Sequence, residues 1–191
     1  NVHILKVFLT SLKSFLTNNK VIFIIFTMIG YTMTTEANDN TLLLELKDGI
    51  VTIEMKPEVA PNHVARIKEL VNSGFYDGLK FHRVIAGFMA QTGDPLGNGT
   101  GGSGKNLNAE FNNERHIRGT LSMARAQDPN SADSQFFICL DDAPHLNGQY
   151  TVWGQVIDGM EYVDGIKKGE GNNGSIIGEP DTIISIKIKS N

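Results

Sequence analysis

The stretch that decides the fold of this chain reads FHRVIAGFMAQTGD and covers residues 81–94. It contains two short apolar runs, Phe81 to Ile85 and Phe88 to Gln91, which are separated by a turn. Further short apolar runs follow at residues 121–123, 135–140 and 152–156. Short runs that are cut by turns at such intervals favour an antiparallel β-barrel or sandwich.

Strands are also expected at both ends of the folded part of the chain. Residues 42–46 and 50–55 are apolar runs joined at Asp48-Gly49, a pair typical of a tight β-hairpin turn. Near the C-terminus apolar and polar residues alternate, and this period of two predicts a last strand. One face of that strand is expected to carry Ile184, Ile186 and Ile188.

Two helices are expected among these strands. The first begins at Pro61 and ends at Gly74, because proline favours the first turn of a helix and glycine favours its end. Its apolar residues recur at helical spacing and define one buried face, formed by Val64, Ile67, Leu70 and Val71. A second, shorter helix fits residues 159–168.

Composition excludes several classes of function. The chain has 191 residues, 40% of them hydrophobic, which suits one domain of ordinary size plus an appendage. The net charge of -4 gives no reason to expect nucleic acid as a partner. The one cysteine, Cys139, excludes an intramolecular disulfide and lies in an apolar run, where we expect it to be buried. The five histidines show no metal-ligand spacing, so no metal site is expected.

The first 37 residues differ from the rest of the chain. Three lysines precede an apolar run at residues 21–31, which has the length of a signal-peptide core and is short for a transmembrane span. Residues 1–37 are therefore predicted to be a signal peptide cleaved after Ala37, and residues 38–191 to be a periplasmic or otherwise exported domain. The alternative is that the same run stays uncleaved and anchors the protein in the inner membrane, which would be its only membrane association.

The glycine-rich loop at residues 97–104 nearly matches a phosphate-binding loop, and it raises nucleotide hydrolysis as an alternative function. The hydroxyl residue that should follow Lys105 is absent, and residues 107–113 do not form a convincing amphipathic helix. The loop would then lack the helix N-terminus that holds a phosphate. No Gly-x-Ser-x-Gly motif marks a serine nucleophile.

Three segments carry the residue types that point to a function: residues 81–94, SQFFI at 134–138 and HLNGQYTVWG at 145–154. Here the sequence resembles the cyclophilins, and the resemblance extends over residues 41–189. It implies a mainly β fold: a closed eight-stranded antiparallel β-barrel capped by two α-helices, with the site on its outer face. It also implies peptidyl-prolyl cis-trans isomerase activity that requires no cofactor.

The resemblance also assigns roles to individual residues. Arg83 would be the catalytic residue, and Gln91 would bond to the substrate backbone. The remaining positions would form the walls of a proline pocket (Phe88, Met89, Phe137, Leu146), the groove (Ala124, Gln135) and its rim (His145, Tyr150).

Two positions, His145 and Arg125, depart from the commonest family pattern, and Tyr150 is a choice that resembles bacterial members. His145 stands where many members have Trp or Phe, which puts tight binding of the cyclosporin class of inhibitor in question. Arg125 stands where Asn is frequent, and Tyr150 stands where other members have His. None of these changes removes the arginine at position 83.

An arginine beside an apolar pocket suits this chemistry. Rotation about a peptide bond faces a barrier of roughly 18–20 kcal/mol, because the nitrogen lone pair is delocalised into the carbonyl. A guanidinium that donates a hydrogen bond toward the prolyl nitrogen would stabilise the twisted state more than the planar one. Arginine suits the task because it stays protonated and holds its donors in a fixed plane.

Two classes of function follow from the resemblance. The first is an isomerase that acts on X-Pro bonds of folding secreted or envelope proteins, with proline-containing polypeptides as partners and a monomer as the expected state. The second is a proline-peptide-binding chaperone module in which turnover is incidental. The presence of both Arg83 and Gln91 favours the isomerase.

Overall fold

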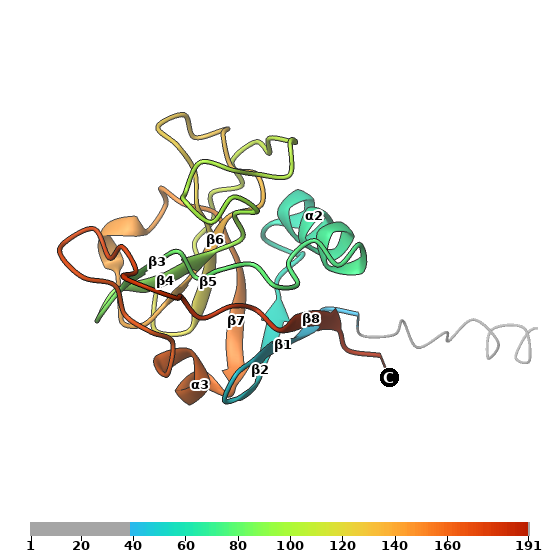
Figure 1. Ribbon diagram of the computed structural model, residues 1–191. Helices are drawn as coiled ribbons and strands as arrows, with labels where there is room; N and C mark the ends of the chain where they lie inside the picture. Colours follow the sequence, from blue (N-terminus) through green and yellow to red (C-terminus); the bar gives the residue numbers. More distant parts are fainter. Residues whose placement is uncertain (1–38, 191) are drawn as a thin grey trace, which may run out of the picture. The chain divides into compact units, whose positions relative to one another are not determined.

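The computed structural model describes residues 39–190, so the predicted leader and its cleavage site lie outside the described residues. Within this range eight strands and two α-helices surround one main core (Figure 1). The elements in chain order are β1 (Thr41–Leu46), β2 (Gly49–Met55), α2 (Pro61–Asn72), β3 (Arg83–Ile85), β4 (Met89–Thr92), β5 (Thr120–Met123), β6 (Phe136–Cys139), the 3-10 helix η1 (Pro144–Leu146), β7 (Val152–Asp158), α3 (Met160–Asp164) and β8 (Ser185–Ile188). The predicted mainly β fold with two helices is confirmed.

All eight strands form a single antiparallel sheet with the order β3-β4-β6-β5-β7-β2-β1-β8. The sheet curls into a half-barrel but stays open, since no ladder among the described residues joins β3 to β8. The sequence predicts a closed barrel, and this part of the prediction is wrong. The segment before β8 instead borders the β3 edge through isolated bridges, Arg83 to Ser175 and Lys80 to Thr182.

Glycines explain why that segment forms no regular strand. Gly171, Gly174 and Gly178 have φ values of 66°, 71° and 74°, which lie outside the β region. At Gly174 an added Cβ would lie 2.5 Å from the side chain of Ile85, so the loop packs closely on β3. The loop therefore covers the sheet edge without extending the ladder.

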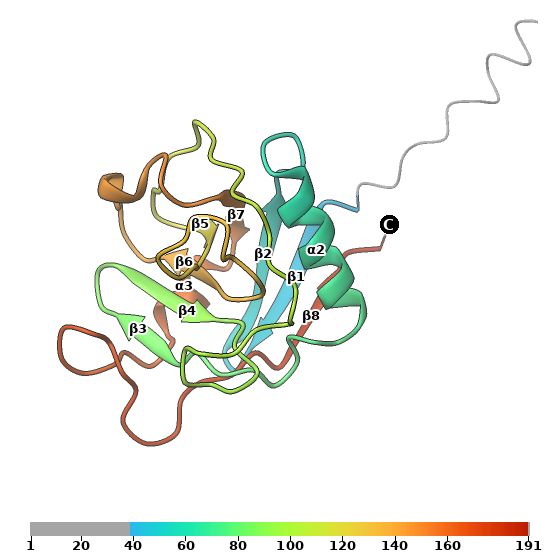
Figure 2. The same ribbon diagram turned by 90° about the horizontal axis from the view of Figure 1, so that it is seen from above.

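The two helices lie against different parts of the sheet. In Figures 1 and 2, α2 runs beside β8 and β1, whereas α3 lies near the turn end of β2. The face that α2 buries contains the predicted residues and also His63. The second helix is shorter than predicted, because Gly159 precedes it with a φ of 81° and Gly165 ends it.

The N-terminus of α2 is capped by a residue distant in sequence. Ala60, at the cap position, offers no side-chain hydrogen bond. The Glu110 carboxylate accepts hydrogen bonds from the backbone N–H groups of Asn62 at 3.1 Å and His63 at 3.0 Å. It also contacts Nδ1 of His63 at 2.7 Å. Glu110 therefore satisfies free amides at the helix start and places a negative charge there.

The prediction that Ile184 shares one face of the last strand with Ile186 is wrong. Ile186 is buried, with 1% of its surface exposed, but Ile184 is 49% exposed. The reason is that the strand begins only at Ser185, and the buried residue before it is Ile183. The alternation therefore starts later than the sequence pattern indicates.

Strand alternation creates a second, smaller apolar cluster on the outer face of the sheet. Along β6, Phe136 and Ile138 enter the main core, whereas Phe137 and Cys139 face the other way. Cys139 is buried as predicted, and burial raises the pKa of its thiol to about 12. The second cluster consists of Met89, Phe137, Cys139, Ala143 and Leu146.

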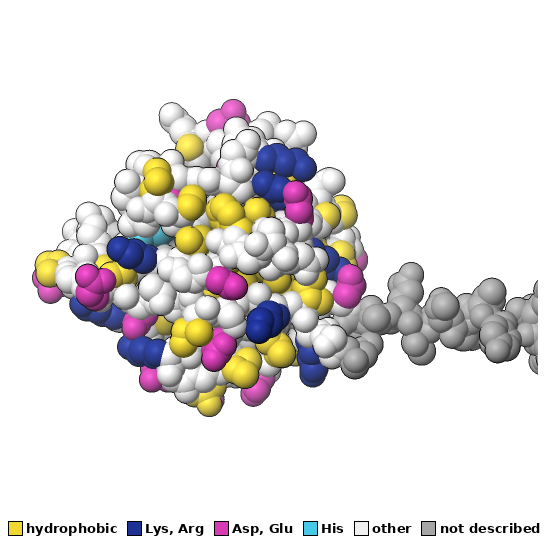
Figure 3. All heavy atoms as spheres, turned by 45° about the vertical axis from the view of Figure 1, so that its right-hand side comes forward, with side chains coloured by type: hydrophobic (Ala, Val, Ile, Leu, Met, Phe, Trp, Pro, Cys, Tyr) yellow, Lys and Arg dark blue, Asp and Glu magenta, His cyan; other side chains and the backbone are white. Residues whose placement is uncertain are grey.

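The surface carries charges of both signs. On the face that Figure 3 shows, acidic and basic side chains are interspersed and no single basic area dominates. Across residues 39–190 the structure contains no helix with the length and apolar character that a membrane crossing requires.

Candidate active site

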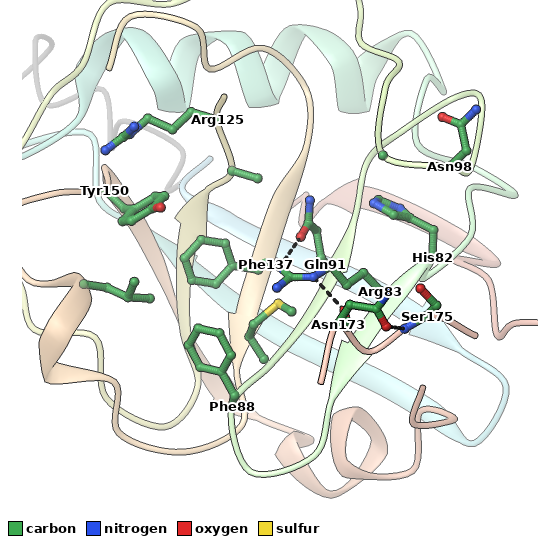
Figure 4. A pocket seen from close by; sticks show the side chains of 14 residues that line it. His82, Arg83, Phe88, Gln91, Asn98, Arg125, Phe137, Tyr150, Asn173 and Ser175 are labelled. Atoms are coloured by element: carbon green, nitrogen blue, oxygen red, sulfur yellow. Dashed lines mark hydrogen bonds between the residues drawn. The ribbon is translucent and has the colours of Figure 1, made fainter. Parts of the chain in front are cut away.

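A pocket of about 430 Å³ opens over the second cluster, on the outer face of β3, β4 and β6. Figure 4 shows His82, Arg83, Gln91, Asn173 and Ser175 on one side, and the aromatic rings with Arg125 on the other. The lining residues are His82, Arg83, Phe88, Met89, Gln91, Asn98, Gly99, Ala124, Arg125, Phe137, Leu146, Tyr150, Asn173 and Ser175.

Strand register places the central side chains in one row. Arg83 of β3 pairs with Gln91 of β4, and Gln91 pairs with Phe137 of β6. Directly opposed residues of antiparallel strands project their side chains from the same face, about 5 Å apart at Cβ. A guanidinium, an amide and an aromatic ring therefore lie side by side.

Hydrogen bonds fix the guanidinium of Arg83 from two sides. Its Nε donates to the carbonyl oxygen of Asn173 at 2.9 Å, and its Nη1 donates to Oε1 of Gln91 at 3.1 Å. Gln91 Nε2 donates to Oε1 of Gln135 at 2.9 Å. The Gln135 amide donates to the carbonyl oxygens of Gly99 at 3.1 Å and Gly101 at 2.8 Å. The arginine thus ends a chain of amides that begins in the glycine-rich loop. Figure 4 shows the last part of this chain, Arg83 beside Gln91 and Asn173.

Aromatic contacts shape the apolar side of the pocket. Tyr150 meets Phe137 edge to face, with ring centroids 6.0 Å apart. His145 lies against Phe88 with centroids 5.4 Å apart, although it is not itself part of the lining. The floor is formed by the buried side chains of Met89, Phe137 and Leu146.

A buried histidine supports the Phe137 ring from behind. His116 stacks on that ring at 6.1 Å with an interplanar angle of 19°. Its Nδ1 contacts Oδ1 of Asn147 at 3.1 Å, and its Nε2 contacts the hydroxyl of Ser122 at 2.9 Å. Burial lowers the pKa of His116, against the raising effect of the Asn147 bond. The neutral imidazole is therefore the favoured form near pH 7.

His82 lies on the polar side of the pocket (Figure 4). Both its ring nitrogens are buried and have no hydrogen-bond partner among the described residues. Burial lowers the pKa of His82, while the nearby Asp94 carboxylate acts in the opposite direction.

The glycine-rich loop is held by two carboxylates. Asp94 accepts hydrogen bonds from the backbone N–H groups of residues 96, 98 and 99, and Asp133 accepts from those of residues 103, 104 and 105. A phosphate-binding loop needs such amides free to point at the ligand. Nucleotide binding at this loop therefore has no support, and residues 39–190 contain no cluster of three potential metal ligands.

The structure brings most of the predicted site residues together. Eight of the ten line the pocket: Arg83, Phe88, Met89, Gln91, Ala124, Phe137, Leu146 and Tyr150. Gln135 lines an adjoining hollow of about 220 Å³, and His145 packs on Phe88 beside the pocket.

Sequence reasoning gives no site role to several other lining residues. Arg125 is noticed in the sequence without such a role, and so is the glycine-rich loop that contains Asn98 and Gly99. His82, Asn173 and Ser175 are given no site role. The Asn173-Gly174 pair is a turn signal. However, a turn signal does not reveal which distant strand the turn contacts, and Asn173 is 90 residues from Arg83.

Comparison with known proteins agrees with this geometry. The family model described as cyclophilin type peptidyl-prolyl cis-trans isomerase/CLD matches residues 41–188. The chain therefore belongs to the cyclophilin family of peptidyl-prolyl cis-trans isomerases, and its enzyme class is isomerase.

Particular relatives support the assignment. A probable peptidyl-prolyl cis-trans isomerase of Brucella suis is 53% identical over 176 residues, which cover 85% of this chain and 90% of the relative. Peptidyl-prolyl cis-trans isomerase B of Bacillus subtilis is 47% identical over 128 residues, covering 65% of this chain and 89% of the relative.

Solved structures agree on the fold. The cyclophilin AquaCyp293 from Hirschia baltica has a TM-score of 0.70 at 30% identity, covering 79% of this chain and 74% of that chain. A cyclophilin type isomerase from Cryptosporidium parvum, solved in the presence of the dipeptide Ala-Pro, has a TM-score of 0.73 at 33% identity. The match covers 79% of this chain and 99% of that chain.

Proposed function

We propose that this chain accelerates rotation about X-Pro bonds in folding or exported polypeptides, and that Arg83 acts on the prolyl bond. The observation that carries the proposal is the fixed guanidinium of Arg83, which lines the same pocket as the apolar side chains of Phe88 and Phe137. A proline-containing peptide is the substrate class, as the Ala-Pro dipeptide used with the Cryptosporidium parvum structure suggests.

The mechanism rests on differential binding of the twisted amide. Asn173 and Gln91 each occupy one donor of Arg83, which leaves its other N–H groups for the substrate. As the X-Pro bond twists, the lone pair returns to the prolyl nitrogen, which becomes a better acceptor. A hydrogen bond from Arg83 would then strengthen in the transition state more than in the ground state. Rotation breaks no covalent bond, so the mechanism requires no nucleophile, metal or cofactor.

The other site residues would hold the substrate. Phe88, Met89, Phe137 and Leu146 would enclose the proline ring, so that one side of the bond is fixed while the other turns. Gln91 would hold the flanking amide and also orient Arg83. The groove would continue along Ala124 and Gln135, with His145 and Tyr150 at its rim.

An isomerisation assay on a short Ala-Pro peptide tests this role, with Arg83→Ala compared with the wild type. We expect kcat/KM to fall by roughly 10²- to 10³-fold, the loss typical of removing one transition-state hydrogen-bond donor. Arg83→Lys keeps the positive charge but lacks the planar guanidinium with its fixed N–H donors, so it should recover only part of the rate.

Peptide binding, followed by NMR chemical shifts, is the control for these variants. Rates equal to wild type in Arg83→Ala, with peptide binding retained, would favour the alternative of a proline-peptide-binding chaperone module with incidental turnover.

The cellular location of the protein is a separate part of the proposal. The lysines and apolar run of residues 1–37 support a cleaved signal peptide and a periplasmic or otherwise exported domain, which we expect to be a monomer. The mass of the mature N-terminus tests this: a start near Asn38 is expected. An intact leader in the membrane fraction would establish the inner-membrane anchor instead. Light scattering of the purified domain measures its molar mass and so tests whether it is a monomer.

A further inference from the structure

Arg125 lies where the main pocket and the adjoining hollow meet, and its side chain lines both. In the view of Figure 4 the Phe137 ring lies between Arg125 and Arg83. A peptide that fills the apolar centre of the pocket would therefore have a guanidinium on either side.

Neither guanidinium is neutralised by a carboxylate within the described residues. No ion pair is formed by Arg83 or Arg125 there, and the main pocket is lined by no acidic side chain. The adjoining hollow has one carboxylate, Asp133, but both its oxygens already accept hydrogen bonds from backbone amides of the glycine-rich loop.

This local charge runs against that of the rest of the chain. From residue 38 onward the sequence has 14 Lys and Arg residues against 20 Asp and Glu residues. The main pocket is therefore lined by two cations and no carboxylate in a domain of net negative charge, and such a local field attracts anionic groups.

Arg125 is held in place before any substrate arrives. Its Nε and Nη2 donate to the carbonyl oxygen of Gln149 at 3.2 and 2.9 Å, and its Nη1 donates to those of Ala126 and Gln127 at 3.0 and 3.1 Å. Its guanidinium carbon lies 4.6 Å from the centroid of the Tyr150 ring. These partners are uncharged, so they orient the cation without cancelling its charge.

We propose that Arg125 is a specificity-determining residue that favours proline peptides with an acidic side chain, Asp or Glu, within two residues of the proline. The inference rests on the proposed isomerase function and adds a preference to it. The carboxylate would approach Nη2 of Arg125, which makes only one of its two possible hydrogen bonds among the described residues, while the proline occupies the apolar centre. Because the Arg125 side chain is already held in place, it loses little conformational entropy when a peptide binds. This favours discrimination between acidic and neutral peptides.

Two series of end-blocked five-residue peptides test this inference, with Glu, Gln or Lys either two residues before or two residues after the proline. Isomerisation is measured by NMR exchange at 20 and 500 mM NaCl. In at least one series we expect kcat/KM to follow the order Glu, Gln, Lys, with Glu roughly three- to fivefold above Gln at low salt. The ratio should approach one at high salt.

Three variants assign the preference to Arg125. Arg125→Gln should reduce the Glu to Gln ratio to about one, whereas Arg125→Lys should keep most of it because the charge remains. Arg115→Gln removes an exposed guanidinium outside both pocket linings and should keep the wild-type ratio. Circular dichroism spectra and thermal midpoints establish that each variant is folded.

The outcomes separate this inference from the function on which it rests. If the wild type turns over Glu and Gln peptides equally in both series, the acidic preference is overturned and the isomerase function stands. The assignment to Arg125 is also overturned if Arg125→Gln keeps the ratio. A complete loss of the ratio in Arg125→Lys would show that contacts to the Gln149 loop matter rather than charge. If no peptide is turned over, the proposed function itself fails.

Discussion

Arg83 and Gln91 face each other across β3 and β4, and Nη1 of Arg83 donates a hydrogen bond to Oε1 of Gln91 at 3.1 Å. Because the two residues are ladder partners, the register of this hairpin places the amide beside the guanidinium. Gln91 is itself held by Gln135, so the orientation of the arginine depends on a residue that does not line the main pocket.

Gln91→Ala should lower kcat about tenfold and also raise KM, because Gln91 would both orient Arg83 and hold the flanking amide of the substrate. The apolar pocket would be intact, but Arg83 would keep only the carbonyl of Asn173 as an anchor, so its donors would be less well aimed in the transition state. Steady-state kinetics on an Ala-Pro peptide measures both constants, with the exposed Gln127→Ala as the matched control. A large rise in KM at unchanged kcat would show that Gln91 holds the flanking amide but does not orient Arg83.

The sequence predicts the local part of this fold well. Glycine turns and period-two patterns depend on neighbouring residues, so the hairpin at Asp48-Gly49 and the strand around Phe137 are found close to their observed bounds. Most of the predicted site residues also line the pocket, because the resemblance to the cyclophilins assigns them, and the motif at residues 81–94 contributes Arg83, Phe88, Met89 and Gln91.

What the sequence does not predict depends on contacts between distant segments. The open edge of the sheet arises from how the loop around Gly174 packs on β3, and the loop's composition does not encode that packing. His116 is likewise unremarkable in the sequence, and only the fold places its ring against Phe137. The same holds for Asn173, whose backbone carbonyl rather than its side chain holds Arg83.

Glu110→Ala should destabilise the protein by about 2–3 kcal/mol, because it removes a charged cap from the start of α2 and leaves amides unpaired. Urea unfolding measures the change, and Glu58→Ala, an exposed acidic position, is the control. Isomerase activity of the folded variant should be unchanged, since Glu110 lines neither the main pocket nor the adjoining hollow. A loss below about 0.5 kcal/mol would contradict the capping role.

Stability should fall as the pH decreases from 7.5 to 5.5. Burial lowers the pKa of both His82 and His116 in the folded state, so the unfolded chain binds more protons just below the ordinary histidine pKa of about 6.5. The free energy of unfolding therefore rises with pH in this window, by at most about 1.4 kcal/mol per pH unit for each histidine. Ordinary carboxylates titrate below this window and contribute little there.

Urea unfolding at pH 7.5, 6.5 and 5.5 checks this dependence. His116→Gln should flatten the pH dependence, and the double variant with His82→Gln should flatten it further, although both are less stable at pH 7.5. A wild type equally stable at all three pH values would show that neither histidine is held neutral by burial.

Gly93→Ala should lower both the free energy of unfolding and kcat, whereas Gly87→Ala should lower only the free energy of unfolding, and by less. Both glycines have positive φ, 87° and 69°, so alanine is strained at each by about 1 kcal/mol. At Gly87 nothing lies within 4 Å of an added Cβ, but at Gly93 the carbonyl oxygen of Ser134 would be 2.4 Å away. That oxygen belongs to the backbone and cannot rotate aside.

We therefore expect Gly93→Ala to lose roughly 3 kcal/mol in urea unfolding, of which about 2 kcal/mol is the clash. Any relief of the clash moves the backbone at Ser134 and the adjoining Gln135, and so displaces the amide that holds Gln91. Assayed where the variant is still folded, kcat should fall several-fold for Gly93→Ala and stay at the wild-type value for Gly87→Ala. Equal kcat in the two variants would mean that Arg83 keeps its orientation when Gln135 moves, and the amide chain would then have no part in positioning it.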